Sequence, residues 1–414
     1  MKNKYKPKVI IFSGGRGNKN LFFAMKKQMN DINELSVIIN GLDDGASTGE
    51  IRRLFHYKAH GISDFLKAIL SLSPNEKLIN ALEARFPMVD NFEERLLLYR
   101  NLHKMLYKNS LPKYLSALSQ IPDKTRKQIL KKFIIFFNYF YQNRDEIIDI
   151  EDFKIGNILF GALLVENNLD FNKATNAFSK FCNLNSKIAI YSNTNSVRFL
   201  SGLLKNGTLL PNEASVVLTR TTDSIKDIYQ MTNPITMNQI RKLSSIEIDD
   251  KISFLESLRS IPIYNEDIKE KILNSDIIVY GSGTPYSSIL PSLETKGVAN
   301  LIKQNENPKV MIANLKKETN NFLYVSDLVK DLYKYLNRSS NKSINKKDLL
   351  THLIIDDATS ESKESKSINF DENVIMNKYP WLKIVKGNFS DPLNPSAHNG
   401  KNVLKTILRI VNDK

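Results

Sequence analysis

The sequence contains a single cysteine and no long apolar run. One thiol, Cys182, cannot form an internal disulfide or a cysteine-rich metal site, so we expect a small buried hydrophobic residue there. The longest apolar and aromatic run, residues 133–141, includes Asn138 and is too short to span a bilayer. The basic start MKNKYKP leads directly into an apolar strand, without the hydrophobic region of a signal peptide. We therefore expect a soluble cytoplasmic protein with no membrane partner.

Positive charge is in excess, since 59 Lys and Arg residues against 44 Asp and Glu residues give a formal net charge of +15. Such a balance raises the question of nucleic-acid binding. The lysines are scattered, however, and only residues 124–132 and 341–347 concentrate charge, without a recognisable nucleic-acid-binding motif around them. We interpret the charge as a solvated surface that also suits an anionic small ligand, and we do not expect a nucleic-acid partner.

Residues 8–20, KVIIFSGGRGNKN, are an apolar run that turns into a glycine-rich loop where a helix begins. Continuous apolarity over residues 9–12 is typical of a parallel strand buried on both faces. Helical spacing from Leu21 onward would place free N–H groups of the loop at a helix N-terminus, which favours a phosphate. SGGRG is neither a Walker loop nor GxGxxG, so a purely structural turn is the alternative. The candidate nucleotide-binding residues are Ser13, Gly14, Gly15, Arg16, Gly17 and Asn18.

A second informative loop, residues 40–49 (NGLDDGASTG), follows the strand expected at residues 35–39. The adjacent carboxylates of Asp43 and Asp44 could hold Mg²⁺ or orient a hydroxyl, and they are the candidate catalytic and metal-binding residues. Ser47 and Thr48 are candidate nucleotide contacts. A loop that only caps the next helix is the alternative interpretation.

Residues 74–151 show helical periodicity without strand-like alternation, which predicts a helical insertion that acts as a lid or a subunit contact. The α/β pattern resumes in residues 153–165, FKIGNILFGALLV, where Gly156 and Gly161 permit close helix packing. Asn157 is an unusual polar residue to bury there, so it is either a ligand contact or a helix-start asparagine. The core domain is expected to comprise residues 1–73 and 152–414.

The third informative stretch, DIIVYGSGTPYSSILPSL from residue 276, repeats the pattern of an apolar strand followed by a glycine turn and a helix. Two such turns suit a crevice at the carboxyl edge of a doubly wound sheet, and we expect the loops beginning at Ser13, Asn40 and Gly281 to converge there. Ser288 could also donate to phosphate or sugar. Further strands are expected at residues 187–191, 310–313, 352–355 and 381–385, and the Asn206-Gly207 pair predicts a hairpin. The candidate binding residues of this stretch are Gly281, Ser282, Gly283, Thr284 and Ser287.

Seven motifs, in this order along the chain, together resemble the 2-phospho-L-lactate transferase (CofD-like) family, including its YvcK-like gluconeogenesis-factor branch. They are SGGRG, INGLDDGASTGEIR, KIGNILFGALL, SNTNSVRFLSGLLKNGTLL, IIVYGSGTPYSSILPSL, KVMIANL and HNGKNVLKTIL. The resemblance covers most of the chain outside residues 74–151. Two departures are Arg16, where the family usually has a small hydroxyl residue, and Ala397, where an arginine is expected before His398.

The resemblance implies a Rossmann-like, three-layer α/β fold with a mainly parallel sheet, often dimeric, with a nucleotide diphosphate derivative bound between the two glycine turns. In the transferase branch, a phosphate-linked group attached to GMP is passed to an acceptor hydroxyl with Mg²⁺ present. The regulatory branch resembles it in fold but is taken to bind UDP-sugars without turnover. The form DDGASTGE resembles the regulatory or uncharacterised branch more closely than the deazaflavin enzymes. We therefore expect either a transferase or a nucleotide-sugar-binding regulator, with Mg²⁺ as cofactor and a possible homodimer.

Overall fold

The computed structural model describes residues 5–15, 17–89, 91–108, 111–143, 150–218, 223–317, 322–340, 342–357 and 367–413. The chain forms two compact units. The sheet unit comprises Met1–Leu42 and Ser186–Lys414, and the helical unit comprises Asp43–Asn185. The expected insertion of residues 74–151 lies within the helical unit, which begins earlier and ends later.

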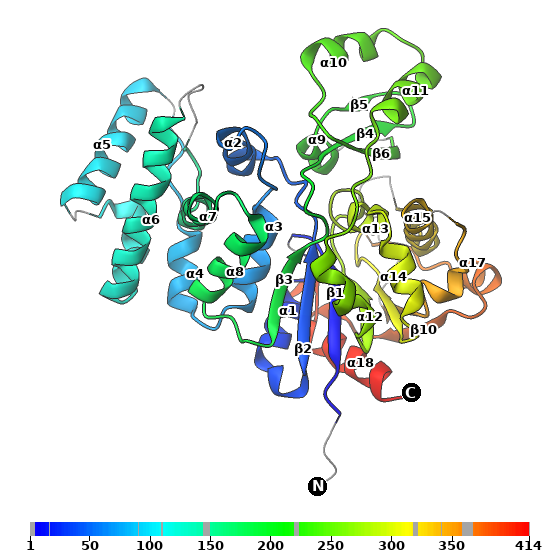
Figure 1. Ribbon diagram of the computed structural model, residues 1–414. Helices are drawn as coiled ribbons and strands as arrows, with labels where there is room; N and C mark the ends of the chain where they lie inside the picture. The colour runs from blue at the N-terminus through cyan, green and yellow to red at the C-terminus, as the bar shows by residue number, and fades with distance from the viewer. Residues whose placement is uncertain are drawn as a thin grey trace. The chain divides into compact units, whose positions relative to one another are not determined.

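A seven-stranded sheet with the strand order β10-β9-β8-β7-β1-β2-β3 is the centre of the sheet unit (Figure 1). All six neighbouring pairs are parallel. β1 and β2 each contain five consecutive buried residues, as expected where helices cover both faces of a parallel sheet. The strands are β1 (Lys8–Ser13), β2 (Glu34–Ile39), β3 (Ile188–Ser192), β7 (Ile277–Tyr280), β8 (Lys309–Ile312), β9 (His352–Asp356) and β10 (Lys383–Gly387).

The strand order is that of a doubly wound sheet. The chain adds β2 and β3 on one side of β1, and later adds β7 to β10 on the other side. The direction of winding therefore reverses between β1 and β7. These two strands pair directly with each other, and Phe12 of β1 lies opposite Tyr280 of β7. The predicted Rossmann-like α/β fold is confirmed, and all seven strands lie within two residues of their predicted bounds.

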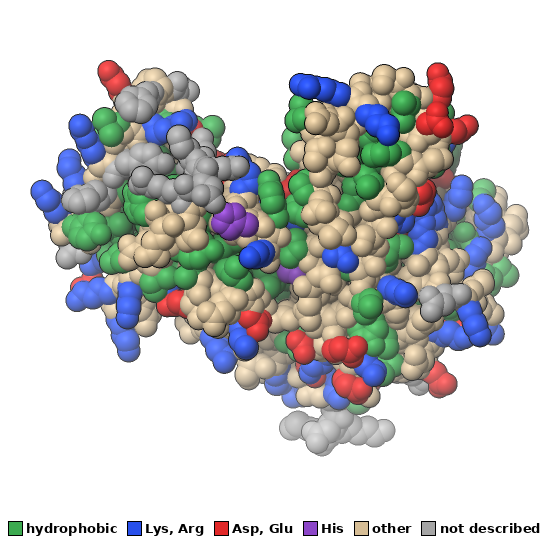
Figure 2. Space-filling view, turned by 45° about the horizontal axis from the view of Figure 1, so that its top comes forward, with side chains coloured by type: hydrophobic (Ala, Val, Ile, Leu, Met, Phe, Trp, Pro, Cys, Tyr) green, Lys and Arg blue, Asp and Glu red, His purple; other side chains and the backbone are tan. Residues whose placement is uncertain are grey.

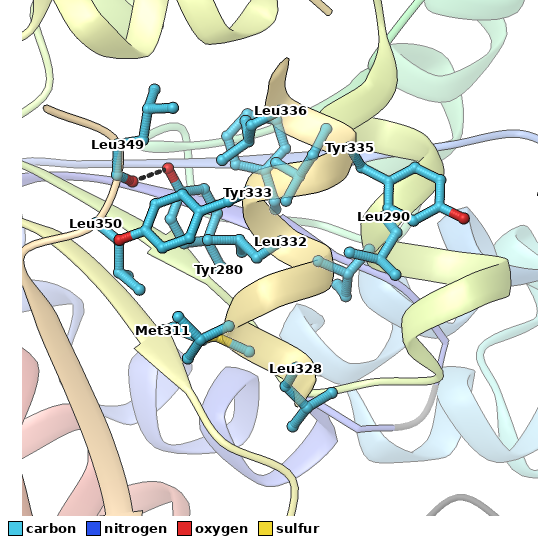
Figure 3. Packing of buried hydrophobic residues seen from close by; sticks show 14 of the residues in the cluster. Tyr280, Leu290, Met311, Leu328, Leu332, Tyr333, Tyr335, Leu336, Leu349 and Leu350 are labelled. Atoms are coloured by element: carbon cyan, nitrogen blue, oxygen red, sulfur yellow. Dashed lines mark hydrogen bonds between the residues drawn. The ribbon is translucent and has the colours of Figure 1, made fainter. Parts of the chain in front are cut away.

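Helices flank this sheet, and the largest part of the core lies under α13, α14 and α15. Figure 3 shows Leu328, Leu332 and Leu336 of α15 packed with Tyr280 and Met311 of the sheet. The helices of the sheet unit are α1 (Lys19–Lys27), α9 (Glu213–Leu218), α10 (Met237–Ser244), α11 (Ile248–Leu258), α12 (Lys269–Leu273), α13 (Leu290–Glu294), α14 (Val298–Gln304), α15 (Val325–Arg338), α17 (Glu372–Lys378) and α18 (Gly400–Asn412).

Two small antiparallel sheets complete this unit: β5-β4-β6, and the β11–β12 pair. The predicted hairpin at Asn206-Gly207 joins β4 to β5, and Gly207 has the positive φ of 85° that favours glycine in such a turn. The strands are β4 (Phe199–Leu204), β5 (Leu209–Leu210), β6 (Ile225–Met231), β11 (Ser390–Asp391) and β12 (Asn394–His398).

A buried ionic network joins β6 to α13 and α15. The Asp227 carboxylate on β6 accepts hydrogen bonds from both terminal nitrogens of Arg338 and, at 2.7 Å, from the Tyr335 hydroxyl. Arg259 Nη1 lies 2.8 Å from the fully buried Glu294 carboxylate on α13. Burial by itself would raise the pKa of Asp227, but the hydrogen bonds and charge of Arg338, with the other nearby cations, lower it to about 2. The network thus fixes the small sheet to the helices of the core.

The helical unit is built around α7, which is apolar on all sides and packs against α4, α6 and α8. A Cβ on Gly161 would lie 2.6 Å from the Phe136 ring, so the glycine allows α6 and α7 to approach closely. Cys182 is buried, as predicted. The helices are α2 (Ala46–Leu54), α3 (Ser63–Leu72), α4 (Glu76–Glu83), α5 (Phe92–Lys108), α6 (Asp123–Gln142), α7 (Ile155–Glu166) and α8 (Phe171–Phe181).

Two surface properties bear on possible partners. Among the helices that the structure describes, none combines the length and apolarity needed to cross a membrane. Lysine and arginine side chains are scattered over the face of the molecule in Figure 2 rather than gathered in one patch.

Candidate functional site

The two glycine turns lie side by side at the carboxyl edge of the sheet, because β1 and β7 are neighbours and parallel. Their backbones approach so closely that side chains would not fit. A Cβ on Gly17 would lie 2.4 Å from the Ser282 carbonyl oxygen, and one on Gly281 would lie 2.4 Å from the Asn18 amide nitrogen. Glycine at both positions therefore allows the two turns to pack directly against each other.

Asn18 joins the two turns through its side chain. Its amide nitrogen donates to the Ser13 hydroxyl at 2.9 Å, and its carbonyl oxygen accepts from the Ser282 backbone N–H at 3.1 Å. The Ser282 hydroxyl in turn donates to the Gly17 carbonyl at 3.0 Å. The sequence singled out Asn18 as a ligand contact, whereas the structure shows its carboxamide engaged by protein groups on both sides.

The loop after β2 reaches the same place through Asn40, which is buried. The Asn40 amide donates to the backbone carbonyls of Ser287 and Ser288, and its carbonyl accepts from Leu42 N–H at 3.1 Å. Ser287 and Ser288 belong to η4 (Pro285–Ile289), which is a π-helical turn, whereas the sequence predicted the start of an α-helix there. These contacts bring together the loops that begin at Ser13, Asn40 and Gly281, as predicted.

The remaining predicted residues of these turns differ in exposure. Gly14 is buried beneath the Ser288 side chain. Gly15, Gly283 and Thr284 are half-buried and Gly17 is exposed, so their backbone stays accessible at the rim. Arg16 lies outside the described residues.

Two asparagines that the site prediction missed also hold the loops at the carboxyl edge of the sheet through hydrogen bonds. One is Asn40, and the other is Asn314, whose amide donates to the Gly283 carbonyl at 3.0 Å. Asn40 is the first residue after β2, and Asn314 is the second residue after β8, so both lie at the carboxyl end of a strand. The rule that ligands bind at the carboxyl ends of parallel strands could therefore have identified both.

His398 lies close to Asn314 and was noted in the sequence only as part of a motif. Its Nε2 is 3.0 Å from the Ala313 carbonyl oxygen, so this nitrogen carries the proton. Burial lowers the pKa of His398, although the hydrogen bond to Ala313 and the charge of Asp356 act in the opposite direction. The hydrogen bond from His398 to the Ala313 carbonyl helps to fix the loop after β8.

The predicted carboxylates belong to the helical unit. The Gly45 N–H donates to Asp43 Oδ1 at 3.3 Å. Burial raises the pKa of the Asp43 carboxyl, and the neighbouring Asp64 carboxylate raises it further, while Lys67 opposes this effect. Asp44 is half-buried. Asp64 was not predicted as a site residue. Its effect on Asp43 becomes visible only in the folded chain.

The other two predicted contacts in this unit also lie near the start of α2. The Asn157 amide on α7 donates to the Ser47 hydroxyl at 2.7 Å, and Thr48 is buried. The described residues contain no group of three or more His, Cys, Asp or Glu side chains that could hold a metal ion. Mg²⁺ is commonly bound by one or two carboxylates together with water and substrate phosphates, so the pair Asp43 and Asp44 has suitable donors for that ion.

Comparisons with known proteins agree with this architecture. The chain is 21% identical over 420 residues to a putative gluconeogenesis factor from Streptococcus pneumoniae, with 99% of each chain covered. It is 23% identical over 341 residues to a gluconeogenesis factor from Listeria monocytogenes, covering 82% of this chain and 77% of that one. A crystal structure of a UPF0052 family member from Bacillus halodurans has the same fold, with a TM-score of 0.65, 17% identity, and coverage of 97% of this chain and 99% of that one.

A match to a protein-family model assigns the chain to a family more directly than these pairwise similarities do. The model described as 2-phospho-L-lactate transferase CofD matches residues 9–383, which include all three loops of the sheet edge and the whole helical unit. This match covers far more than half of the sequence, so the chain belongs to the 2-phospho-L-lactate transferase CofD family.

Proposed function

We propose that the sheet unit binds a nucleotide diphosphate derivative or a nucleotide sugar, with the phosphates at the turns after β1 and β7. The observation that carries this proposal is the direct packing of two glycine turns at the point where the winding of the sheet reverses. Open α/β sheets bind ligands in the crevice at such a point. Free N–H groups of glycine turns and helix starts favour phosphate there.

The first candidate function is a CofD-like transfer of a phosphate-linked group, which the family membership supports. The acceptor hydroxyl oxygen would form a bond to phosphorus as the bond from phosphorus to the nucleotide oxygen breaks, and the nucleotide monophosphate would leave. Backbone N–H groups would stabilise the negative charge on the phosphoryl oxygens, and a carboxylate would accept the hydroxyl proton. Asp43 and Asp44 of the helical unit would be the ligands of Mg²⁺, the ion that supplies positive charge in such transfers.

The second candidate is a regulator that binds a nucleotide sugar without turnover. Two relatives that match most of the chain are named putative gluconeogenesis factor and gluconeogenesis factor, and these names favour a regulatory role. In this case Asp43 and Asp44 would cap α2 and take no part in a reaction.

A thermal-shift screen tests the binding proposal. GDP, UDP and UDP-sugars are added to the full chain with and without Mg²⁺, and a ligand at one hundred times its dissociation constant should stabilise the protein by roughly 2.7 kcal/mol. The absence of any change in melting temperature with all of these ligands would refute the nucleotide site.

A turnover assay then separates the two candidates. For a transferase, Asp44→Asn should abolish product formation and leave nucleotide affinity largely unchanged. A regulator would form no product even as the wild type, while still binding the nucleotide.

We also propose, from the family resemblance, that the chain forms a homodimer in which the helical segment 74–151 acts as a lid or an interface. Light scattering after size-exclusion chromatography would test the dimer, and a monomeric mass would contradict it.

A further inference from the structure

We propose that the hairpin formed by β11 and β12, residues 390–398, is the part of the sheet unit that contacts the nucleobase of a bound nucleotide. In this role the apolar residues at its tip, Pro392 and Leu393, pack against the flat face of the base. The inference rests on the proposed nucleotide site and gives a role to a segment that lies outside the matched residues 9–383 of the family model.

The first observation is the place of the hairpin on the sheet. β10 runs parallel to β9 and ends at Gly387, which lies opposite Asp356, the last residue of β9. The hairpin begins three residues later, at Ser390. It therefore starts at the carboxyl edge of the sheet, where the two glycine turns also lie and where open α/β sheets bind ligands.

The second observation is that hydrogen bonds hold the base of the hairpin to this edge. Asp356 Oδ2 accepts from the backbone N–H groups of Phe389 and Ser390, at 2.6 and 2.5 Å. At the other end of the hairpin, His398 Nε2 lies 3.0 Å from the carbonyl oxygen of Ala313, the residue that follows β8. The hairpin is thus attached to the ends of both β8 and β9.

The third observation joins the hairpin to α1, the helix whose start is proposed to bind phosphate. The Asn20 amide donates to the His398 carbonyl at 2.9 Å and to Asp391 Oδ2 at 3.2 Å. Asn20 is the second residue of α1 and follows Gly17 by three residues. The hairpin therefore borders the first turn of α1, beside the turn after β1.

The tip of the hairpin is apolar and projects from this fixed base. Leu393 is 97% exposed, and Pro392 is exposed beside it. The Leu393 N–H donates to Asp391 Oδ1 at 2.9 Å, and prolines at 392 and 395 restrict the backbone on both sides of the tip. A single exposed leucine is common on protein surfaces, so its place next to α1 is what points to a ligand. A tip restrained in this way loses little conformational freedom when it makes a contact.

The chemistry of the hairpin favours the base over the other parts of a nucleotide. Leucine and proline side chains have no hydrogen-bonding groups, so they suit an aromatic face better than a phosphate or the hydroxyl groups of a sugar. The Asp391 carboxylate, two residues from Leu393, would also repel a phosphate. We therefore expect the hairpin to strengthen the binding of UDP or GDP and to leave the binding of inorganic pyrophosphate unchanged.

Calorimetric titration of the full chain with UDP, GDP and inorganic pyrophosphate tests this contact. Leu393→Ser should weaken binding of UDP or GDP by roughly 5- to 20-fold, the factor for partial burial of a leucine side chain, and Leu393→Met should bind as the wild type does. Neither substitution should lower the melting temperature without ligand, because the side chain is almost fully exposed. Met376→Ser removes another exposed apolar side chain, on α17 of the same unit, and is the matched control.

Hydrogen exchange gives a second, independent measurement. Amide exchange in peptides covering residues 389–398 should slow when the wild type is saturated with UDP or GDP, because the base would shield the tip. Saturation with pyrophosphate should leave exchange in these peptides unchanged. Faster exchange, or equal slowing with pyrophosphate, would contradict a base contact.

The outcomes separate this inference from the proposed function. If the wild type binds none of UDP, GDP and pyrophosphate, the proposed function fails and the role of the hairpin fails with it. If UDP or GDP binds but Leu393→Ser binds it within about twofold of the wild type, only the role of the hairpin is overturned. Equal weakening of pyrophosphate binding would overturn it as well, and so would weakening seen with UDP-sugars but not with UDP, because the tip would then contact the phosphates or the sugar.

Discussion

Replacing Asp227 by asparagine tests how the sheet unit holds its small antiparallel sheet. The substitution keeps the shape and one acceptor oxygen of the side chain, but it removes the negative charge that Arg338, Arg259 and Lys334 surround. Asp227 lies on β6, and its partners lie on α15 and after α11. The variant should therefore be less stable than the wild type at neutral pH.

The pKa of Asp227 sets the size of this effect. This pKa falls from 3.8 to about 2 in the folded protein, although burial alone would raise it. Lowering a pKa by one corresponds to about 1.4 kcal/mol, so the charge contributes about 2 kcal/mol of folding free energy at pH 7. The side chain is only 12% exposed, so solvent screening reduces this value little. Because the folded pKa is depressed, the contribution is present above pH 4 to 5 and is lost as the pH falls through about 2.

Urea unfolding at a series of pH values measures this effect. The only tryptophan, Trp381, lies in the sheet unit, so its fluorescence follows the unfolding of that unit. The free-energy difference between the wild type and Asp227→Asn should be about 2 kcal/mol at pH 7 and should fall to roughly half of that by pH 3. Glu306→Gln, at an exposed carboxylate of the same unit, is the control and should show no such change. A difference in unfolding free energy below about 0.5 kcal/mol at pH 7 would refute the reasoning, and so would a difference that does not vary with pH.

Three further predictions follow from single contacts. Gly161→Ala should destabilise the helical unit by about 1–3 kcal/mol in urea unfolding followed by circular dichroism, because the added Cβ would lie 2.6 Å from the Phe136 ring. Tyr280→Phe should cost about 1 kcal/mol, measured by Trp381 fluorescence, because the Leu349 carbonyl loses the hydroxyl donor at 2.6 Å that Figure 3 shows. Burial and a neighbouring carboxylate raise the pKa of Asp43, so Mg²⁺ affinity measured by calorimetry should fall as the pH is lowered toward that pKa, and less so in Asp43→Asn. Unchanged stability for either of the first two variants, or pH-independent Mg²⁺ binding, would contradict the corresponding argument.

The strands could be predicted because the signal for each is local. Continuous apolarity in β1, β2 and β7 follows from burial on both faces, and a glycine turn after a strand is visible in a short stretch of sequence. For the same reason Gly14, Gly17 and Gly281 could be named as candidates for the site before their neighbours were known.

Other features depended on packing partners that the sequence does not reveal. The helical unit extends over Asp43–Asn185 because α7 is buried on all sides and needs helices from both before and after residues 74–151. The π-helical form of η4 depends on hydrogen bonds from Asn40, which is 247 residues away from Ser287 in the chain. A local pattern contains no information about such a donor.

The α/β class, the strands and the glycine turns that follow two of them can be read from the sequence, because short-range patterns of burial and backbone freedom specify these features. The sequence predicted that the two turns converge, but the pairing of β1 with β7 that brings them together is visible only in the folded chain. The same holds for Asn18 and Ser282, which are 264 residues apart and hydrogen-bonded. The physical reason is that strand order results from the free energy of packing the whole core, to which every strand and helix contributes, whereas each turn depends only on its own few residues.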